Sequence, residues 1–199
     1  MTYHDRILAD STDRPAWLAA RRHRITASIA AKLSKPESIH LYLAAILRDG
    51  DWDGNAYTRH GTAMEPALLA WARIPQNTYL IHAEGDDRFA ATPDGIEVLD
   101  SGELVLAQVK TTAKPFKTIP LGYRRQVWWE QFCLGAERTK FIWDLHDGAF
   151  DMTSLEPHVE IIERNDAEIK RMLAIANPLH DLLLEALAFE RDMDLEVAA

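Results

Sequence analysis

The sequence has one cysteine, Cys133, among 199 residues. It therefore has no intrachain disulfide, and no cysteines and histidines cluster at the spacing of zinc ligands. No stretch approaches the ~18 consecutive apolar residues of a membrane-spanning helix. The first 17 residues, MTYHDRILADSTDRPAW, lack the apolar core of a secretory signal. These absences predict a cytoplasmic protein with neither structural zinc nor contact with a membrane.

Acidic residues are missing from two long segments, although the chain as a whole is acidic. Its 22 lysines and arginines stand against 31 aspartates and glutamates, for a formal net charge of −9. Residues 14–36 nevertheless contain six cations and no acid, and residues 104–129 contain five cations and no acid. One interpretation is two solvated helix faces. The other is that the segments converge into an anion site of the kind that a phosphate backbone needs.

The remaining pattern is typical of one globular α/β domain. Hydrophobic residues make up 47 % of the chain and charged residues 27 %. We expect a central mixed β-sheet flanked by helices, with a helical part over 1–75, a sheet core over 76–162 and a C-terminal helix over 163–199. Hydrophobic periodicity predicts helices over 15–24, 25–34, 38–48, 61–73, 120–135 and 165–190. Alternating apolar residues between turn residues predict strands over 78–84, 88–100, 103–111 and 158–163. Turn residues further predict a loop over 49–55 and a hairpin over 139–153. In this scheme Pro66 lies in the first turn of its helix, Asp147-Gly148 forms the hairpin turn, and the last helix breaks near Pro178.

Two short motifs carry the chemistry. Pro93-Asp94-Gly95 turns the chain between strands, and Gln108 and Lys110 lie two residues apart on the next strand, so their side chains share a face. A hairpin of these strands brings Asp94 beside that face. An acidic oxygen, a second oxygen ligand and a lysine are what metal-assisted hydrolysis of a phosphodiester needs, because the cation activates water and the lysine stabilises charge on the phosphate.

This combination resembles the PD-(D/E)xK nucleases, whose fold has a restriction-endonuclease-like core. Three further segments are similar to the lambda exonuclease family, the YqaJ-type viral recombinases, and occur in that family's order: Arg24-Ile25-Thr26-Ala27-Ser28, Gly61-Thr62-Ala63-Met64-Glu65 and Tyr123-Arg124-Arg125-Gln126. The resemblance extends over residues 17–143, which is most of the chain.

The resemblance implies a Mg²⁺-dependent exonuclease, with two metal ions and Mn²⁺ as a substitute. It would degrade linear duplex DNA from its ends, 5′ to 3′, in phage-type homologous recombination. It further implies a trimer, a single-strand annealing protein as partner, and a phage or prophage gene expressed in the bacterial cytoplasm. The implied metal ligands are Glu65, Asp94, residue 108 and the Val109 carbonyl, and Lys110 is the implied catalytic lysine. The implied contacts with DNA and its 5′ phosphate are Arg24, Thr26, Ser28, Tyr123, Arg125 and Gln126.

Elementary chemistry supports parts of this assignment and leaves simpler interpretations open. Thr26 and Ser28 stand where a helix is expected to begin, and N–H groups there bind anions. They also suit a plain helix cap, with Arg24 in solvent. Tyr123 and Gln126, one helical turn apart, suit ordinary packing against the sheet. Glu65 on a mostly apolar helix needs a cation partner if it is buried.

The chain departs from the family pattern at Gln108, where the family has glutamate. A neutral amide removes one negative charge from the first shell of the cation, so metal binding should weaken. Three explanations remain open: a substitution introduced to stop cleavage, a native glutamine, or a compensating carboxylate from Glu130 or Glu103. The alternatives for function follow from this. The protein is then a DNA-end-binding protein with impaired cleavage, or an endonuclease or RecB-like nuclease of the same fold.

Overall fold

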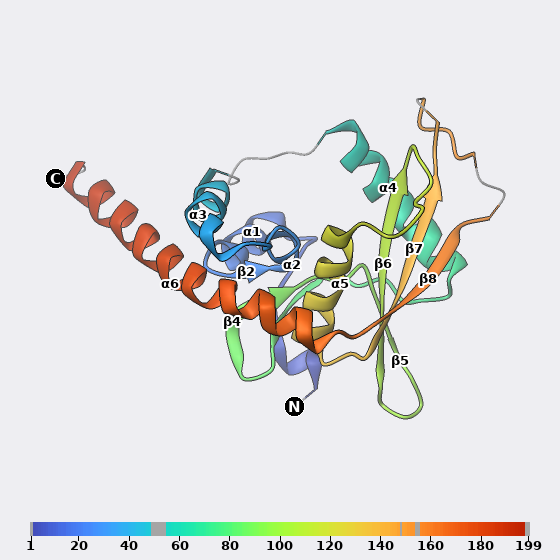
Figure 1. Ribbon diagram of the computed structural model, residues 1–199, viewed down its shortest axis with the longest axis horizontal. Helices are drawn as coiled ribbons and strands as arrows, with labels where there is room; N and C mark the ends of the chain where they lie inside the picture. Colours follow the sequence, from blue (N-terminus) through green and yellow to red (C-terminus); the bar gives the residue numbers. More distant parts are fainter. Residues whose placement is uncertain (1, 49–54, 148, 154–155, 198–199) are drawn as a thin grey trace.

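A computed structural model describes residues 2–48, 55–147, 149–153 and 156–197 (Figure 1). Within this part of the chain, eight strands form two four-stranded mixed sheets, so the prediction of a single central sheet was wrong. The first sheet has the order β1 (Ile7–Asp10), β3 (Tyr79–Ala83), β4 (Asp86–Ala91) and β2 (Ile25–Thr26). The second has the order β5 (Gly95–Val98), β6 (Leu104–Thr112), β7 (Arg138–Leu145) and β8 (His158–Glu163).

The sheets separate within the predicted strand segment 88–100, at Pro93-Asp94-Gly95, where the sequence predicts a turn. Strand β4 ends at Ala91, and the chain passes through Pro93, which has no N–H to give to a ladder, before β5 begins at Gly95. Strands β1 and β2 also lie within the segment 1–75 that was expected to be helical. Both are short, and each pairs with a distant strand, so local periodicity does not indicate them.

The predicted elements need three corrections besides the shortening of the helix expected over 25–34 to residues 27–30, since residues 25–26 form a strand. The helices are α1 (Arg14–Arg22), α2 (Ala27–Ala30), α3 (Ile39–Arg48), α4 (Ala56–Trp71), α5 (Leu121–Leu134) and α6 (Asp166–Val197), with short 3₁₀ turns at Tyr3–Arg6 and Pro36–Ser38. Helix α4 begins earlier than expected because Asn55 caps the Thr58 N–H at 3.0 Å, so Pro66 lies inside the helix. Helix α6 continues through Pro178, where Ile175, Ala176 and Leu179 are buried and hold both sides of the proline in place.

The third correction concerns the hairpin over 139–153. Strand β7 pairs in parallel with β6 and antiparallel with β8, and the expected hairpin is limited to its tip. There His146 forms an isolated antiparallel bridge with Met152, and the Thr153 N–H donates to the Leu145 carbonyl at 2.9 Å. Gly148 of the expected turn and most of the loop over 49–55 lie outside the described residues. The strand over 158–163 is confirmed as β8, and the helix from Pro120 to Gly135 is confirmed as α5, which ends on Gly135 with φ of +77°.

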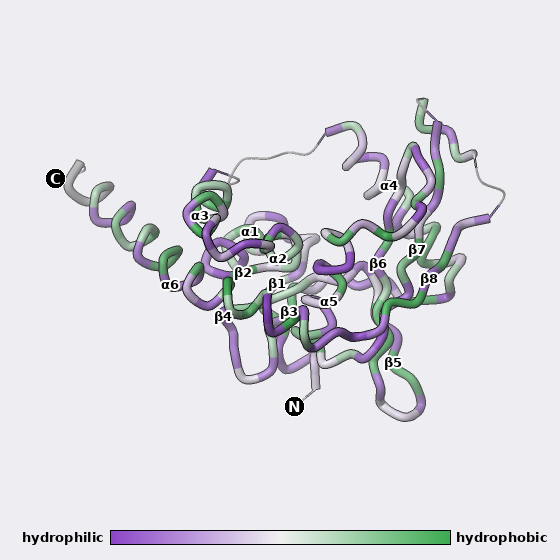
Figure 2. The backbone as a smooth tube through the Cα atoms, in the orientation of Figure 1, coloured by the Kyte–Doolittle hydropathy of each residue, from purple (hydrophilic) through white to green (hydrophobic). Residues whose placement is uncertain are grey.

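Helix α5 forms the centre of the molecule, between the two sheets (Figures 1 and 2). One continuous hydrophobic cluster joins it to strands of both sheets and to the first half of α6. Trp129 is fully buried and packs edge-on against Phe89 of β4, with ring centroids 5.2 Å apart. The buried part of α5 begins at Val127, whereas Leu121 at its start is half exposed, so the core holds the later turns and leaves the first turn near the surface.

Helix α6 leaves the body of the protein in its second half, where it runs out to the C-terminus (Figure 1). By length and apolar composition alone, the segment 166–193 would suit a membrane span. Its first half is apolar for another reason, because Ile169, Met172 and Leu179 are buried in the core of the protein.

Candidate functional site

Asp94 is held at the open edge of β6. The ladder between β5 and β6 ends at the pair of Gly95 with Ala107, and β6 continues to Thr112 without a neighbouring strand on that side among the described residues. The Val109 N–H donates to Asp94 Oδ2 at 2.6 Å, and the Gln108 side-chain amide donates to the same oxygen. In a strand the N–H and C=O of one residue point to the same side, so the Val109 carbonyl also faces the Asp94 side.

The backbone at Gly95 explains why Asp94 reaches this place. A Cβ built on Gly95 would lie 2.8 Å from Ile74 Cγ2, 2.9 Å from Leu69 Cδ2 and 3.0 Å from the Pro75 carbonyl oxygen. These contacts are too short for any side chain. Only glycine lets the end of α4 and the segment after it pack this closely over the start of β5.

Glu65 and Lys110 approach Asp94 from two different elements. Helix α4 packs on one face of β6 through Leu68 and Leu69, and Glu65 on this helix accepts a hydrogen bond from Gln76 at 3.0 Å. Lys110 projects from β6, with its Nζ 5.5 Å from the centroid of the Tyr123 ring. We call Glu65, Asp94 and Lys110 the carboxylate cluster.

The carboxylate cluster carries more negative charge than it can neutralise. Burial, and next the charge of Asp94, raise the pKa of Glu65 to about 7, although the Gln76 hydrogen bond and Lys110 oppose the rise. Burial also raises the pKa of Asp94, against the attraction of Lys110 and the two N–H donors. Two partly desolvated carboxylates that share one lysine favour a further cation.

The amides of Gln108 and Gln126 connect the carboxylate cluster to a buried acid. Gln126 on α5 donates from Nε2 to Gln108 Oε1 at 2.7 Å and to Glu130 Oε1 at 3.0 Å. Gln108 is 1 % exposed and Glu130 is fully buried. Burial, followed by the charge of Asp94, raises the pKa of Glu130 well above its usual range. The other candidate for compensation, Glu103, lies next to the start of β6 and pairs with Arg138 at 2.8 Å.

The hydroxyls of Thr26 and Ser28 lie 3.2 Å apart, and Arg21 donates to both, at 3.4 and 3.1 Å. We call Arg21, Thr26 and Ser28 the hydroxyl cluster. Arg24, the arginine predicted from sequence, is directed elsewhere: it donates to the Asp87 carbonyl and to the Ala20 carbonyl, each at 2.7 Å. Helix α2 has four residues, so the affinity of this cluster for anions depends on side chains rather than on a helix end.

The sequence reasoning overlooked Arg21, although a signal was present. Arg21 stands four residues after Trp17 in α1, and its guanidinium lies 4.1 Å from the centroid of the Trp17 ring. Residues four apart share a helix face, so this pair indicates an arginine fixed over an aromatic ring. Gln76, the partner of Glu65, carries no comparable signal.

The hydroxyl cluster and the carboxylate cluster flank the same end of α5. Gly122, in its first turn, lies beside the Ala31 carbonyl at the end of α2, while Gln126, one turn later, bonds to Gln108. Arg125 lies between them in sequence and forms no hydrogen bond or ion pair with the described residues. The structure thus brings the predicted Glu65, Asp94, Gln108, Lys110 and Gln126 together and places the end of α2 beside the start of α5, while Arg24 bonds elsewhere.

The donor set suits a hard divalent cation. Carboxylate and carbonyl oxygens are the ligands that Mg²⁺ prefers, and Glu65, Asp94 and Val109 offer them. Among the described residues, no three His, Cys, Asp or Glu side chains gather as a possible metal site. A cation here would therefore rely on two carboxylates and on a backbone oxygen.

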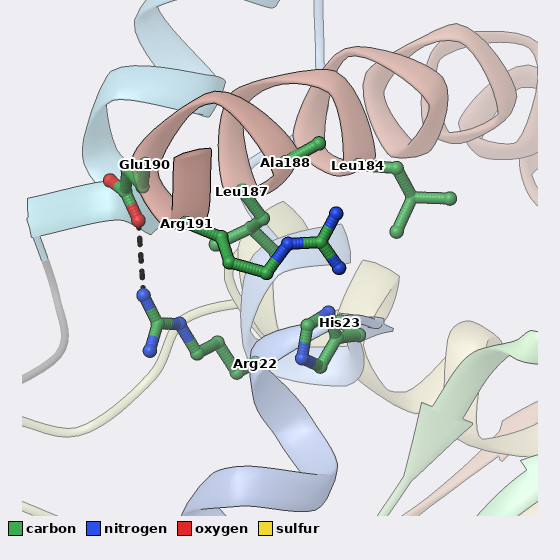
Figure 3. A pocket seen from close by; sticks show the side chains of 7 residues that line it. All are labelled: Arg22, His23, Leu184, Leu187, Ala188, Glu190 and Arg191. Carbon is green, nitrogen blue, oxygen red and sulfur yellow. Dashed lines mark hydrogen bonds and ion pairs between the residues drawn. The ribbon is translucent and has the colours of Figure 1, made fainter. Parts of the chain in front are cut away.

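A cavity of about 430 Å³ lies away from these clusters, between the end of α1 and the second half of α6 (Figure 3). Arg22 and Glu190 form an ion pair of 3.0 Å at its rim, and Leu184 and Leu187 contribute apolar surface. None of the residues that line it belongs to the predicted site.

The chain has the fold of an alkaline exonuclease and of a phage-related exonuclease. It superimposes on the alkaline exonuclease LHK-Exo of Laribacter hongkongensis with a TM-score of 0.67, 24 % identity, and coverage of 92 % of this chain and 99 % of that one. The same enzyme in complex with dAMP gives a TM-score of 0.65 at 21 % identity over the same shares. A phage-related exonuclease of Haemophilus somnus 129PT gives 0.59 at 15 % identity, over 82 % of this chain and 96 % of that one. No protein-family model and no curated protein sequence matches the chain. The resemblance predicted from the motifs is confirmed in fold.

Proposed function

We propose that this protein is a Mg²⁺-dependent exonuclease that degrades linear double-stranded DNA from its ends. One observation carries the proposal: Asp94 is bonded to β6 beside Val109, with Lys110 one residue further and Glu65 across from it. This occurs in a fold shared with two exonucleases over most of the chain. The LHK-Exo complex with dAMP supports a nucleotide ligand for the fold.

The residues take the following roles in this proposal. Glu65, Asp94 and the Val109 carbonyl hold the cation, with residue 108 as the fourth predicted position. When bound, Mg²⁺ lowers the pKa of water and polarises the phosphate. Lys110 stabilises the negative charge that develops on the phosphoryl oxygens.

The hydroxyl cluster binds the terminal 5′ phosphate of the strand, because a guanidinium and two hydroxyls can all donate to phosphate oxygens. The sequence motif also places Arg24 in this set, but its guanidinium donates to the Asp87 and Ala20 carbonyls, so Arg21 takes its place. Tyr123, Arg125 and Gln126 contact the DNA next to the hydroxyl cluster. The 5′-to-3′ direction, the trimer, the annealing partner, phage-type recombination and the cytoplasm of a bacterial host complete the proposal by family resemblance alone.

A nuclease assay with two substrates tests the proposal. We expect the purified chain with Mg²⁺ or Mn²⁺ to degrade 5′-phosphorylated linear duplex and to leave closed circular DNA intact. Cutting of the circle would indicate an endonuclease instead. Loss of neither substrate, with or without Gln108→Glu, would exclude a nuclease.

The second candidate function is binding to DNA ends without efficient cleavage. Gln108 favours it, because this side chain brings no negative charge and directs an N–H toward Asp94. In that case, the wild-type chain shifts end-labelled duplex in a gel without shortening it, and Gln108→Glu restores cleavage.

A further inference from the structure

We infer that Gln108 positions Asp94 as a hydrogen-bond donor instead of binding the cation, and that Glu130 fixes it in this role through Gln126. The inference rests on the proposed function, because it concerns the metal site of that enzyme. It gives Gln108 a different role from the ligand role that the family resemblance implies. It also gives Glu130 a role as a positioning residue, which no motif indicates.

The directions of the hydrogen bonds carry the first step. An amide donates from its nitrogen and accepts at its oxygen, so the two ends are not equivalent. Glu130 Oε1 and Gln108 Oε1 both lie within hydrogen-bond distance of Gln126 Nε2, at 3.0 and 2.7 Å. Because Glu130 Oε1 needs a donor, the NH₂ group of Gln126, and not its carbonyl oxygen, lies between Glu130 and Gln108. The second N–H of this group donates to Gln108 Oε1, so that oxygen already has a hydrogen-bond partner.

The second step follows from the other end of Gln108. With its oxygen on Gln126, its nitrogen necessarily faces Asp94 and donates to Oδ2. The Val109 N–H donates to the same Oδ2 at 2.6 Å. Two donors anchor one oxygen of Asp94 and leave Oδ1 to bind a cation.

Glu130 also needs an explanation of its own. It is fully buried in the middle of α5, and its Oε2 has no hydrogen-bond partner within the described residues. Leaving a buried polar atom unpaired costs about 1–3 kcal/mol, so packing alone favours an apolar residue at this position. Burial raises the pKa of Glu130, and the one hydrogen bond that its side chain forms is the bond that Oε1 accepts from Gln126 within the described residues.

Measuring Mn²⁺ affinity by calorimetry, without DNA, tests the role of Glu130 in the full chain. We expect Glu130→Leu to weaken Mn²⁺ binding roughly 10–100-fold, the loss typical when a residue that orients a metal ligand is removed. Gln126→Met removes the same connection from the other side and should weaken binding similarly. The matched control is Gln131→Met, a buried neighbour on α5 that bonds to Thr139 and the Ile162 carbonyl, at 3.0 and 2.8 Å, and should leave the affinity unchanged.

Two further measurements separate positioning from a merely structural effect. In a Gln108→Glu background, Glu130→Leu should no longer weaken Mn²⁺ binding, because a carboxylate at 108 binds the ion directly. In crystals of the wild-type chain soaked with Mn²⁺, the anomalous peak of the ion should lie within bonding distance of Asp94 Oδ1, and Gln108 Oε1 should lie outside the coordination sphere.

Either of two results overturns the inference while the proposed function stands: Gln108 Oε1 bound to the ion, or wild-type affinity in Glu130→Leu. Equal losses from Glu130→Leu in both backgrounds also overturn it, because the effect is then structural. The proposed function itself fails if neither the wild-type chain nor Gln108→Glu binds Mn²⁺ or cleaves DNA.

Discussion

The carboxylate cluster and the hydroxyl cluster are assembled in opposite ways. The first gathers Glu65, Asp94 and Lys110 from three separated segments and forces two carboxylates together in a partly buried place. The second lies within one short stretch of chain, and its arginine and hydroxyls already bond to one another. The relative positions of the side chains in the carboxylate cluster are therefore set by how the backbone of three segments packs. Those in the hydroxyl cluster are set mainly by hydrogen bonds between the side chains themselves.

The largest expected effect comes from removing the charge of Asp94. Asp94→Asn should lower Mg²⁺-dependent cleavage of linear duplex at least about 100-fold, because metal stabilisation of the transition state contributes several kcal/mol. Glu97→Gln on β5, the strand that follows Asp94, is the control, since Glu97 pairs with Lys140 at 3.1 Å away from the cluster. Initial rates at saturating Mg²⁺ provide the measurement. Unchanged rates in Asp94→Asn would exclude Asp94 as the main metal ligand.

Backbone sensitivity is tested at Gly95. Gly95→Ala should lower the free energy of unfolding by about 1–3 kcal/mol, because the added methyl overlaps Ile74 and Leu69. Gly122→Ala is the matched control, since its nearest contact, to the Ala31 carbonyl, is an ordinary 3.7 Å. Urea denaturation followed by circular dichroism measures both. If the two variants unfold at the same urea concentration, the carboxylate cluster does not depend on this close approach.

The roles of Arg21 and Arg24 can be distinguished by how strongly each variant still prefers 5′-phosphorylated DNA ends. Arg21→Ala should reduce the ratio of cleavage rates on 5′-phosphorylated and unphosphorylated duplex about tenfold, which corresponds to one charge-assisted hydrogen bond. Arg24→Ala should instead lower thermal stability, because Arg24 joins α1 to Asp87. If only Arg24→Ala changes the ratio, the prediction from the sequence motif holds and Arg21 is the structural residue.

The smallest expected effect is a dependence of stability on pH. Glu65, Asp94 and Glu130 each have a raised pKa in the folded chain, so the folded state binds more protons than the unfolded state above their ordinary pKa values. The contribution of Glu65 to the free energy of unfolding is fully present below pH 4.5, the ordinary pKa of a glutamate, and is lost as the pH rises through about 7, its pKa in the folded chain. The melting temperature of the metal-free chain should therefore fall between pH 5 and pH 8.

Mg²⁺ should reverse this trend, since it binds the ionised carboxylates and stabilises the folded state. Differential scanning fluorimetry with EDTA or Mg²⁺ at each pH provides the measurement. The variant Glu65→Gln should show a smaller fall in melting temperature. A melting temperature that rises from pH 5 to pH 8 without metal would contradict the shared burial of these carboxylates.

The sequence predicted the members of the site better than their contacts. The motifs selected Asp94, Gln108 and Lys110, and the structure brings these residues together at one strand edge. The direction of the Gln108 amide could not be predicted, because it depends on Gln126 and Glu130 across the core. Arg21 and Arg24 show the same limit locally, since the motif names residue types and the packing of α1 decides which guanidinium meets the hydroxyls.

The fold shows where periodicity was sufficient and where it was not. Helix α5 was predicted with its Pro120 start and Gly135 end, because both signals lie within the segment. Strands β1 and β2 were missed because their pairing partners, β3 and β4, stand far away in the sequence. The division into two sheets depends on how the chain crosses between Ala91 and Gly95, which is decided by tertiary contacts around Pro75.

The burial of α5 has a consequence for the spacing of the two clusters. Its first turn touches α2, its second turn bonds to Gln108, and its later turns are buried in the core. A strand end seated at Thr26 and Ser28 would thus meet Asp94 at a fixed separation, set by a rigid helix rather than by a flexible loop. In such an arrangement the distance between the two clusters, which α5 sets, determines which phosphodiester bond of the strand lies at the carboxylates.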